Sequence, residues 1–147
     1  MKVIGVVPAR MAASRFPGKV LYQIQGKAMI EHVYHRAKMY DHWDSLVVAT
    51  CDKEIKDFCK NKRFPVILTG SHHTRALDRV AEAVENLQEE VKDTDIVVCV
   101  QGDEPMMRPD MIETVVKPLI SDDTIPCSVL AMHITDKKIW LKFSCIK

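Results

Sequence analysis

Three cationic side chains follow the first apolar segment of the chain, with a spacing suited to holding phosphate groups. The apolar run 3–7 is followed by Arg10, Arg15 and Lys19, with small residues between them and a Pro-Gly turn at 17–18. Arg binds phosphate oxygens through two parallel hydrogen bonds, whereas Lys acts as a point charge. The segment lacks both GxxxxGK[ST] and GxGxxG, so it is neither a P-loop nor a dinucleotide loop. We interpret it as a polyphosphate-binding loop; the alternative is a solvated loop whose cations only aid solubility.

A second segment ends another apolar run with two carboxylates. Gln101, Gly102, Asp103 and Glu104 follow the run 96–100 directly. Gly lets a backbone pass close to a ligand. A carboxylate at a strand's carboxyl end can bind Mg²⁺, which takes few protein ligands and several phosphate oxygens. A metal site and a plain β-turn are equally favoured, because the sequence Gly-Asp-Glu-Pro is also typical of β-turns.

Two further segments carry polar side chains for which a structural role is favoured over a functional one. Asp52 follows the apolar run 46–49 and is favoured as the N-cap of a helix. His72 and His73 are adjacent, so their rings are expected to diverge, and without a third ligand nearby they are interpreted as loop residues. In the next helix Asp78 suits the first turn. Arg79 is placed either opposite the apolar stripe of that helix or near its edge, and from there it can reach a pocket.

Apolar strand-like runs alternate with helical patterns along the chain. This alternation predicts an α/β fold with a mainly parallel sheet. In such a sheet ligands bind beyond the carboxyl ends of the strands, which is where the loops described above would meet. The run 96–100 is apolar throughout and is therefore expected to be a central strand. The expected strands are 2–7, 46–49, 65–68, 96–100 and 126–132, and the expected helices are 28–40, 52–61, 77–90 and 109–119.

The size, charge and cysteine content narrow the class of protein. The 147 residues suit one domain, and a formal net charge of +1 provides no overall field for binding nucleic acid or an anionic membrane. We expect neither a membrane span nor a signal peptide, because no apolar run approaches ~20 residues and the first one is short. The five cysteines are odd in number and widely spaced, without a zinc pattern. They are interpreted as reduced and mostly buried thiols of a cytoplasmic protein.

Taken together, the motifs resemble a known family. The segments that carry the resemblance are Pro8-Ala9-Arg10, Arg15-Phe16-Pro17-Gly18-Lys19, Val48-Ala49-Thr50 with Asp52, Asp78-Arg79, and Gln101-Gly102-Asp103-Glu104-Pro105. Over roughly residues 1–133 the chain is similar to the 3-deoxy-manno-octulosonate (Kdo) cytidylyltransferases, the CMP-Kdo synthetases of lipopolysaccharide synthesis. The first and last motifs together are specific for this family, whereas either alone indicates only a sugar nucleotidyltransferase.

The resemblance implies a Rossmann-like nucleotidyltransferase fold and a reaction in which CTP and Kdo give CMP-Kdo and pyrophosphate with Mg²⁺. It implies that Arg10, Arg15 and Lys19 hold the triphosphate, with Arg10, Lys19 and Asp103 as the catalytic residues. Asp103 would ligate Mg²⁺ beside the α-phosphate. Gln101 would face the sugar acid, and Asp78 and Arg79 would complete the nucleotide site.

The chain departs from the family pattern in three places. Cys51 stands where the family usually has an acidic residue, and 75–77 (Arg-Ala-Leu) replaces the Ser-Gly-Thr that helps to recognise cytosine. The family members are about a hundred residues longer, so we expect a truncated domain over 1–134 and a divergent apolar and basic tail over 135–147. The alternatives are a cytidylyltransferase for another acidic sugar, such as an acylneuraminate, or an inactive nucleotide-binding module. A homodimer is implied only by the resemblance.

Overall fold

The computed structural model describes residues 1–13 and 15–131, and its main element is a four-stranded parallel sheet. The strand order is β5-β4-β1-β6, and every neighbouring pair in it is parallel. The predicted α/β class with a mainly parallel sheet is therefore confirmed. The strands are β1 (Val3–Ala9), β4 (Ser45–Thr50), β5 (Val66–Leu68) and β6 (Ile96–Cys99).

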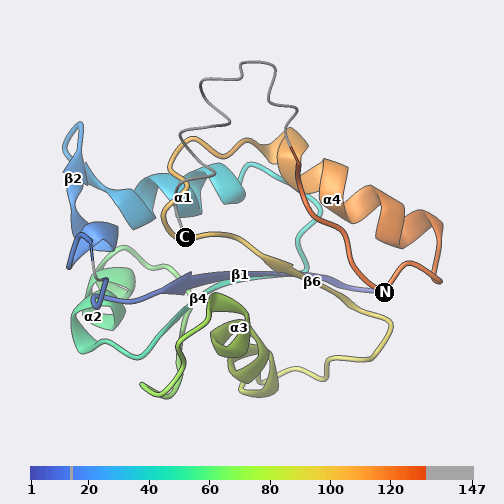
Figure 1. Ribbon diagram of the computed structural model, residues 1–147, viewed down its shortest axis with the longest axis horizontal. Coiled ribbons are helices and arrows are strands. Elements are labelled where there is room, and N and C mark those ends of the chain that lie inside the picture. Colours follow the sequence, from blue (N-terminus) through green and yellow to red (C-terminus); the bar gives the residue numbers. More distant parts are fainter. Residues whose placement is uncertain (14, 132–147) are drawn as a thin grey trace.

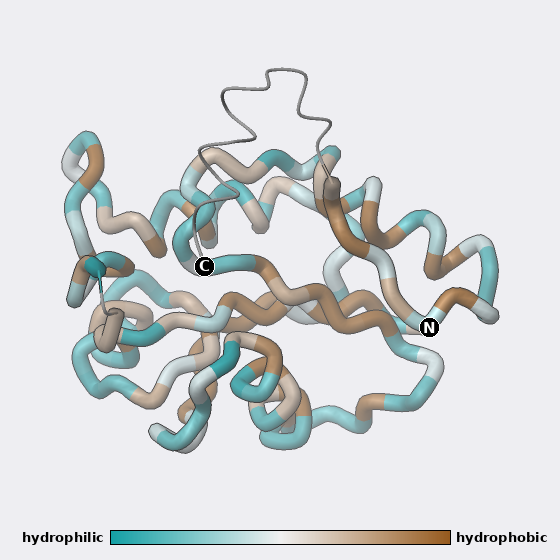
Figure 2. The backbone as a smooth tube through the Cα atoms, viewed as in Figure 1, coloured by the Kyte–Doolittle hydropathy of each residue, from teal (hydrophilic) through white to brown (hydrophobic). Residues whose placement is uncertain are grey.

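Helices cover both faces of this sheet, as Figure 1 shows for α3 on one side and α1 and α4 on the other. Side chains of β1 alternate between the two faces, so Ile4 and Val6 pack towards α3 while Val3 and Val7 pack towards the other helices. Figure 2 shows the resulting hydrophobic band along the central strands. The helices are α1 (Met29–Ala37), α2 (Lys53–Asn61), α3 (Ala76–Glu85) and α4 (Pro109–Ser121).

Between β1 and α1 the chain forms a short substructure that carries part of the site. It consists of the 3₁₀ helix η1 (Lys19–Leu21) and the hairpin of β2 (Gln23–Ile24) and β3 (Lys27–Ala28). The hairpin turn places Gly26 at φ +78°, a left-handed conformation that favours glycine. Val20 of η1 is buried in the main core, which fixes the neighbouring Lys19 relative to the sheet.

At the amino-terminal edge of the sheet, two aspartates hold the start of β1. The backbone N–H of Val3 donates to Asp44 Oδ2, and that of Lys2 donates to Asp95 Oδ1, both at 2.7 Å. Backbone N–H groups of Lys92 and Lys2 lower the pKa of Asp95, because they stabilise its carboxylate. These contacts stabilise the amino-terminal edge of the sheet.

Several predicted elements are corrected by the structure. Strand β6 pairs with β1 alone and is an edge strand of the described sheet, not a central one, and Val97 in it is exposed. An apolar run thus indicated a strand but not its position. The run predicted as a fifth strand over 126–132 forms no strand in its described part, 126–131, where most side chains are exposed. Helices α1 and α3 end earlier than predicted, at Ala37 and Glu85.

Two other expectations concern the cysteines and the end of the chain. Of the four cysteines in the described part, Cys59 is buried, Cys51 and Cys99 are half-buried and Cys127 is exposed. The prediction that most of the cysteines are buried is therefore wrong. Burial raises the pKa of the Cys59 thiol to about 11, which keeps it protonated at neutral pH. The predicted domain boundary at 134 and the divergent tail 135–147 lie outside the described residues. No helix within 1–13 and 15–131 is long and apolar enough to cross a membrane.

Candidate active site

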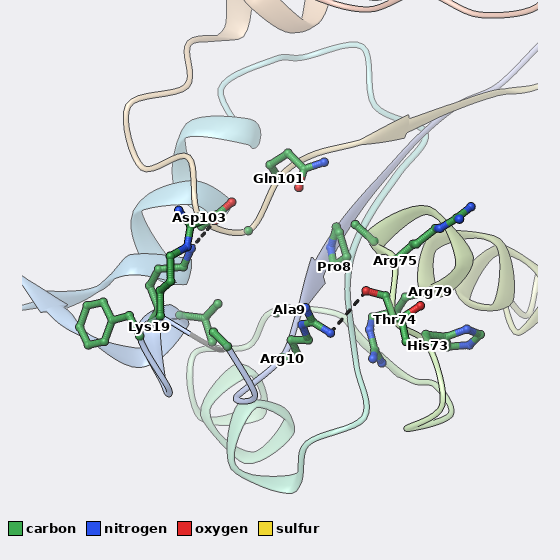
Figure 3. A pocket seen from close by; sticks show the side chains of 16 residues that line it. Pro8, Ala9, Arg10, Lys19, His73, Thr74, Arg75, Arg79, Gln101 and Asp103 are labelled. Atoms are coloured by element: carbon green, nitrogen blue, oxygen red, sulfur yellow. Dashed lines mark hydrogen bonds and ion pairs between the residues drawn. The ribbon is translucent and has the colours of Figure 1, made fainter. Parts of the chain in front are cut away.

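A cavity of about 620 Å³ opens at the carboxyl edge of the sheet. Its walls come from the loop after β1, the loop before α3 and the loop after β6, so three segments far apart in sequence meet there. All of the predicted site residues line it except Asp78, which is exposed in the first turn of α3. Figure 3 shows Lys19 and Asp103 at one end of the cavity and Thr74, Arg75 and Arg79 at the other, with Arg10 between them.

The loop after β1 is closed on itself and anchored to the next strand along the sheet. Gly18 has a φ of +70°, and its N–H donates to the carbonyl of Met11 at 2.8 Å. The N–H of Met11 in turn donates to Asp52 Oδ2 at 2.7 Å. Asp52 occupies the N-cap position of α2, but its side chain makes no capping hydrogen bond. The prediction that Asp52 acts as a helix cap is therefore wrong for its side chain, because the carboxylate is used to hold the cationic loop.

Replacing Asp52 with Ala is expected to weaken binding of CTP, the nucleotide that the family resemblance implies, although no direct contact with it is lost. The change leaves the Met11 N–H without its acceptor, which costs about 1–3 kcal/mol for a half-buried donor and frees the loop that carries the cations. Asp52→Asn retains an acceptor oxygen and should restore most of the affinity. Calorimetry measures the affinity for CTP, and thermal unfolding measures the loss of stability.

The matched control for this change is Asp57→Ala, which removes an exposed carboxylate from the same helix. It should leave CTP affinity unchanged. If Asp52→Ala lowered thermal stability while CTP affinity stayed at the wild-type value, the loop-anchoring role would be refuted and Asp52 would matter to α2 only.

At one end of the cavity, Lys19 and Asp103 form an ion pair between the loop after β1 and the loop after β6. Their side chains remain 32% and 42% exposed, so both groups are open to a ligand. The N–H of Glu104 donates to the carbonyl of Gln101 at 3.2 Å, which closes a turn. The turn interpretation is thus correct for the backbone, and it is this turn that brings Asp103 to the cavity wall.

Gly102 explains how this turn comes so close to β1. A Cβ atom on residue 102 would lie 2.5 Å from the carbonyl oxygen of Pro8 and 3.7 Å from Cγ1 of Val7. Only a residue without a side chain allows the two backbones to approach in this way. The N–H of Val100 donates to the carbonyl of Val6 at 2.9 Å just before this point, which holds the two segments together.

Arg10 and Arg79, two arginines of the cavity wall, differ in their freedom to bind a ligand. Arg10 is exposed, and its Nη1 donates to the carbonyl of Thr74 at 3.4 Å. Arg79 is only 3% exposed and donates to Thr69 Oγ1 and to the carbonyl of Gly70. Arg79 therefore reaches the cavity as predicted, but its guanidinium is also committed to holding the loop before α3.

The cavity wall also contains residues that were not predicted as ligands. Arg75 and Thr74 line it, and Arg75 belongs to the segment where the chain departs from the family pattern. Arg75 adds a cation to those of Arg10, Arg15 and Lys19, against the single carboxylate of Asp103. The sequence features that could have identified Arg75 as a site residue are its charge and its position just before a helix. Such a wall attracts a polyanion, and the exposed Asp103 carboxylate is a ligand of the kind that Mg²⁺ prefers.

Comparisons with known proteins agree with this chemistry. A family model described as cytidylyltransferase matches residues 4–139. A 3-deoxy-manno-octulosonate cytidylyltransferase of Syntrophotalea carbinolica is 43% identical over 130 residues, which cover 88% of this chain and 50% of that protein. The mitochondrial enzyme of that name from Arabidopsis thaliana is 40% identical over 137 residues, covering 93% of this chain and 45% of its own length. The chain thus spans about half the length of these curated relatives.

Solved structures support both the fold and the similarity to the 3-deoxy-manno-octulosonate cytidylyltransferases. A structure of CMP:2-keto-3-deoxy-manno-octonic acid synthetase complexed with CTP superposes with a TM-score of 0.76 at 35% identity, over 86% of this chain and 50% of that chain. A 4-diphosphocytidyl-2C-methyl-D-erythritol synthase gives a TM-score of 0.61 at 17% identity, over 79% of this chain and 53% of that one, and shows the shared fold alone. The predicted Rossmann-like nucleotidyltransferase fold is thereby confirmed.

Proposed function

Because the chain belongs to the cytidylyltransferase family, we propose that it binds CTP and contributes to transfer of CMP to Kdo with release of pyrophosphate. The observation that carries the proposal is the likeness to a CMP-Kdo synthetase complexed with CTP, at 35% identity and a TM-score of 0.76. The cationic cavity at the sheet's carboxyl edge supports it independently, because a triphosphate needs such a wall. A role in lipopolysaccharide synthesis, a cytoplasmic location and a dimer stay predictions.

In this proposal the cationic loop holds the triphosphate. Arg10 and Arg15 bind the phosphate oxygens through their guanidinium groups, and Lys19 lies beside the reacting phosphate. The Lys19 ammonium exchanges its contact with Asp103 for one with phosphate when the nucleotide enters, because its side chain is flexible and part-exposed. Asp103 is then free to act as the ligand of Mg²⁺, which when bound supplies positive charge beside the α-phosphate.

The reaction is an in-line displacement at the α-phosphorus. A hydroxyl oxygen of the sugar acid forms the new bond to phosphorus as the bond to the β-phosphate oxygen breaks, and pyrophosphate leaves. The chain contributes by positioning the triphosphate and by stabilising the charge that develops on its oxygens, which are the main sources of catalysis in such transfers. Gln101 is exposed at the cavity wall and is assigned to the sugar acid, and Arg79 supports the nucleotide from the same wall. Asp78 lies outside that wall and is given no contact with the nucleotide.

Titration calorimetry with CTP, UTP, ATP and GTP, each with and without Mg²⁺, tests the proposal. We expect CTP to bind most tightly and Mg²⁺ to strengthen its binding. Equal affinities for all four nucleotides would refute the assignment to cytidylyl transfer, and absence of binding would refute the nucleotide site. Incubation with CTP and Kdo, followed by release of pyrophosphate, tests the acceptor; turnover with an acylneuraminate instead would favour the other acidic sugar.

A further inference from the structure

Three side chains of a metal-ligating type meet beside the cavity, and one of them, His73, lines it. His72 and His73 belong to the loop between β5 and α3, and Glu82 belongs to α3. Each offers one ligand atom, and these atoms all lie within 4.8 Å of one another. The expectation from the sequence that no third ligand lies near the two histidines is therefore wrong, since the fold supplies Glu82 from the following helix.

The path of the loop explains why the two adjacent histidine rings come together. Their centroids are 4.1 Å apart and the ring planes are tilted by 43°, whereas adjacent side chains of a regular strand point to opposite faces. The His72 ring occupies the space that a Cβ on Gly70 would fill. Glycine at position 70 thus makes room for the ring beside its neighbour.

The Glu82 carboxylate is held in place by the backbone of the same loop. The N–H of Gly70 lies 2.9 Å from both carboxylate oxygens, and His73 Nε2 contacts Oε2. Hydrogen bonds from His73 and Gly70 lower the pKa of Glu82, because they stabilise its charged form. A metal at this site would replace the contact between His73 and Glu82, while the Gly70 N–H would continue to orient the carboxylate, as groups around bound metals commonly do.

The combination of two imidazoles and one carboxylate determines which cation would bind. It is the donor set of zinc sites with three protein ligands, in which a fourth position stays open for water. Mg²⁺ prefers an all-oxygen environment, so these ligands do not duplicate the role assigned to Asp103. Access is open, because His72 is exposed and the side chains of His73 and Glu82 are 11% and 27% exposed.

We propose that His72, His73 and Glu82 form a binding site for Zn²⁺ or a similar transition-metal ion, which clamps the loop between β5 and α3 onto α3. The same loop carries Thr74 and Arg75 in the cavity wall, and Arg10 contacts the carbonyl of Thr74. Metal binding is thereby linked to the wall that faces the phosphates. The competing explanation is a metal-free hydrogen bond between His73 and Glu82, with His72 uninvolved.

His72 separates the two explanations, because the structure gives it no hydrogen bond to Glu82 and its exposed ring can be removed without loss of core packing. The full chain, stripped of metal, is titrated with Zn²⁺ and with Co²⁺ and followed by calorimetry and by the visible absorption of Co²⁺. We expect one equivalent to bind, and His72→Ala and Glu82→Gln each to weaken it by at least about tenfold. His42→Ala, which removes an exposed histidine elsewhere, is the matched control and should bind as wild type does.

Three results would overturn the proposal: no saturable binding, full affinity in His72→Ala, or thiolate charge-transfer absorption in the Co²⁺ complex. The last would assign the metal to a cysteine. The proposal does not depend on the proposed nucleotide function, since both titrations are made without nucleotide. A variant that fails to bind metal is checked by thermal unfolding, so that loss of the fold is distinguished from loss of a ligand.

Discussion

Replacing Asp103 with Asn is expected to abolish the effect of Mg²⁺ on CTP binding. The carboxylate is the charge at the cavity wall that suits the ion. Removing one unit of charge about 4 Å from a cation near the surface costs on the order of a few kcal/mol. At about 1.4 kcal/mol per factor of ten, the affinity measured with Mg²⁺ should fall by about tenfold or more. Calorimetry of both proteins with CTP, with and without Mg²⁺, gives the four affinities required.

The same substitution should have the opposite effect when Mg²⁺ is absent. Asp103 then repels the phosphates and holds Lys19 in an ion pair, so Asn at this position frees the ammonium for the nucleotide. We therefore expect Asp103→Asn to bind CTP without Mg²⁺ at least as tightly as the wild type. Glu104→Gln is the matched control, since Glu104 is the adjacent exposed carboxylate and does not line the cavity. An unchanged response to Mg²⁺ in Asp103→Asn would mean that the segment is a turn without a metal role.

The second large effect is expected for Gly102→Ala, which should lower both stability and CTP affinity. The added Cβ would lie 2.5 Å from the carbonyl oxygen of Pro8, a backbone atom that has no flexible side chain to move aside. Relief requires the segment after β6 to shift away from β1, which strains the hydrogen bond between Val100 and Val6. Overpacking of this kind costs about 1–3 kcal/mol, and each kcal/mol lowers Tm by roughly 2–4 °C in a chain of this size.

The effect on binding follows from geometry, because the shift separates Asp103 from Lys19 and Arg10. Thermal unfolding and CTP calorimetry of Gly102→Ala measure the two losses. Gly26→Asn is the control: position 26 has a left-handed φ that Asn tolerates, and a Cβ there meets no atom within 4 Å. If Gly102→Ala matched the control in both Tm and affinity, close approach of the two backbones would not be the reason for glycine at position 102.

The main parts of the site could be predicted from the sequence because they depend on local patterns. An apolar run followed by Arg10, Arg15 and Lys19, and another followed by Asp103, indicate strands that end in functional loops. A parallel sheet brings the carboxyl ends of its strands to one edge, so the meeting of these loops follows from the fold class alone. The structure confirms that arrangement around one cavity.

Features that depend on neighbours in space could not be predicted in this way. An apolar run shows that 96–100 is a strand, but its place at the edge of the described sheet depends on which strands pair with it. Likewise, Asp52 before a helix matches the pattern of an N-cap, yet its carboxylate binds the Met11 N–H. A capping pattern says nothing of a competing donor supplied by a loop about forty residues away, since the two segments meet only after folding.

The histidine pair shows most clearly the difference between what the sequence determines and what only the folded structure determines. The residue types and their order were evident from the sequence: two imidazoles after Gly70, then a helix whose first turns carry Asp78 and Glu82. Which of the acidic side chains reaches the rings depends on the angle at which α3 leaves the loop and on the space left by Gly70. Charge and chemistry are properties of single residues and can be read along the chain, whereas ligand sets and positioning contacts arise from distances that only tertiary packing establishes.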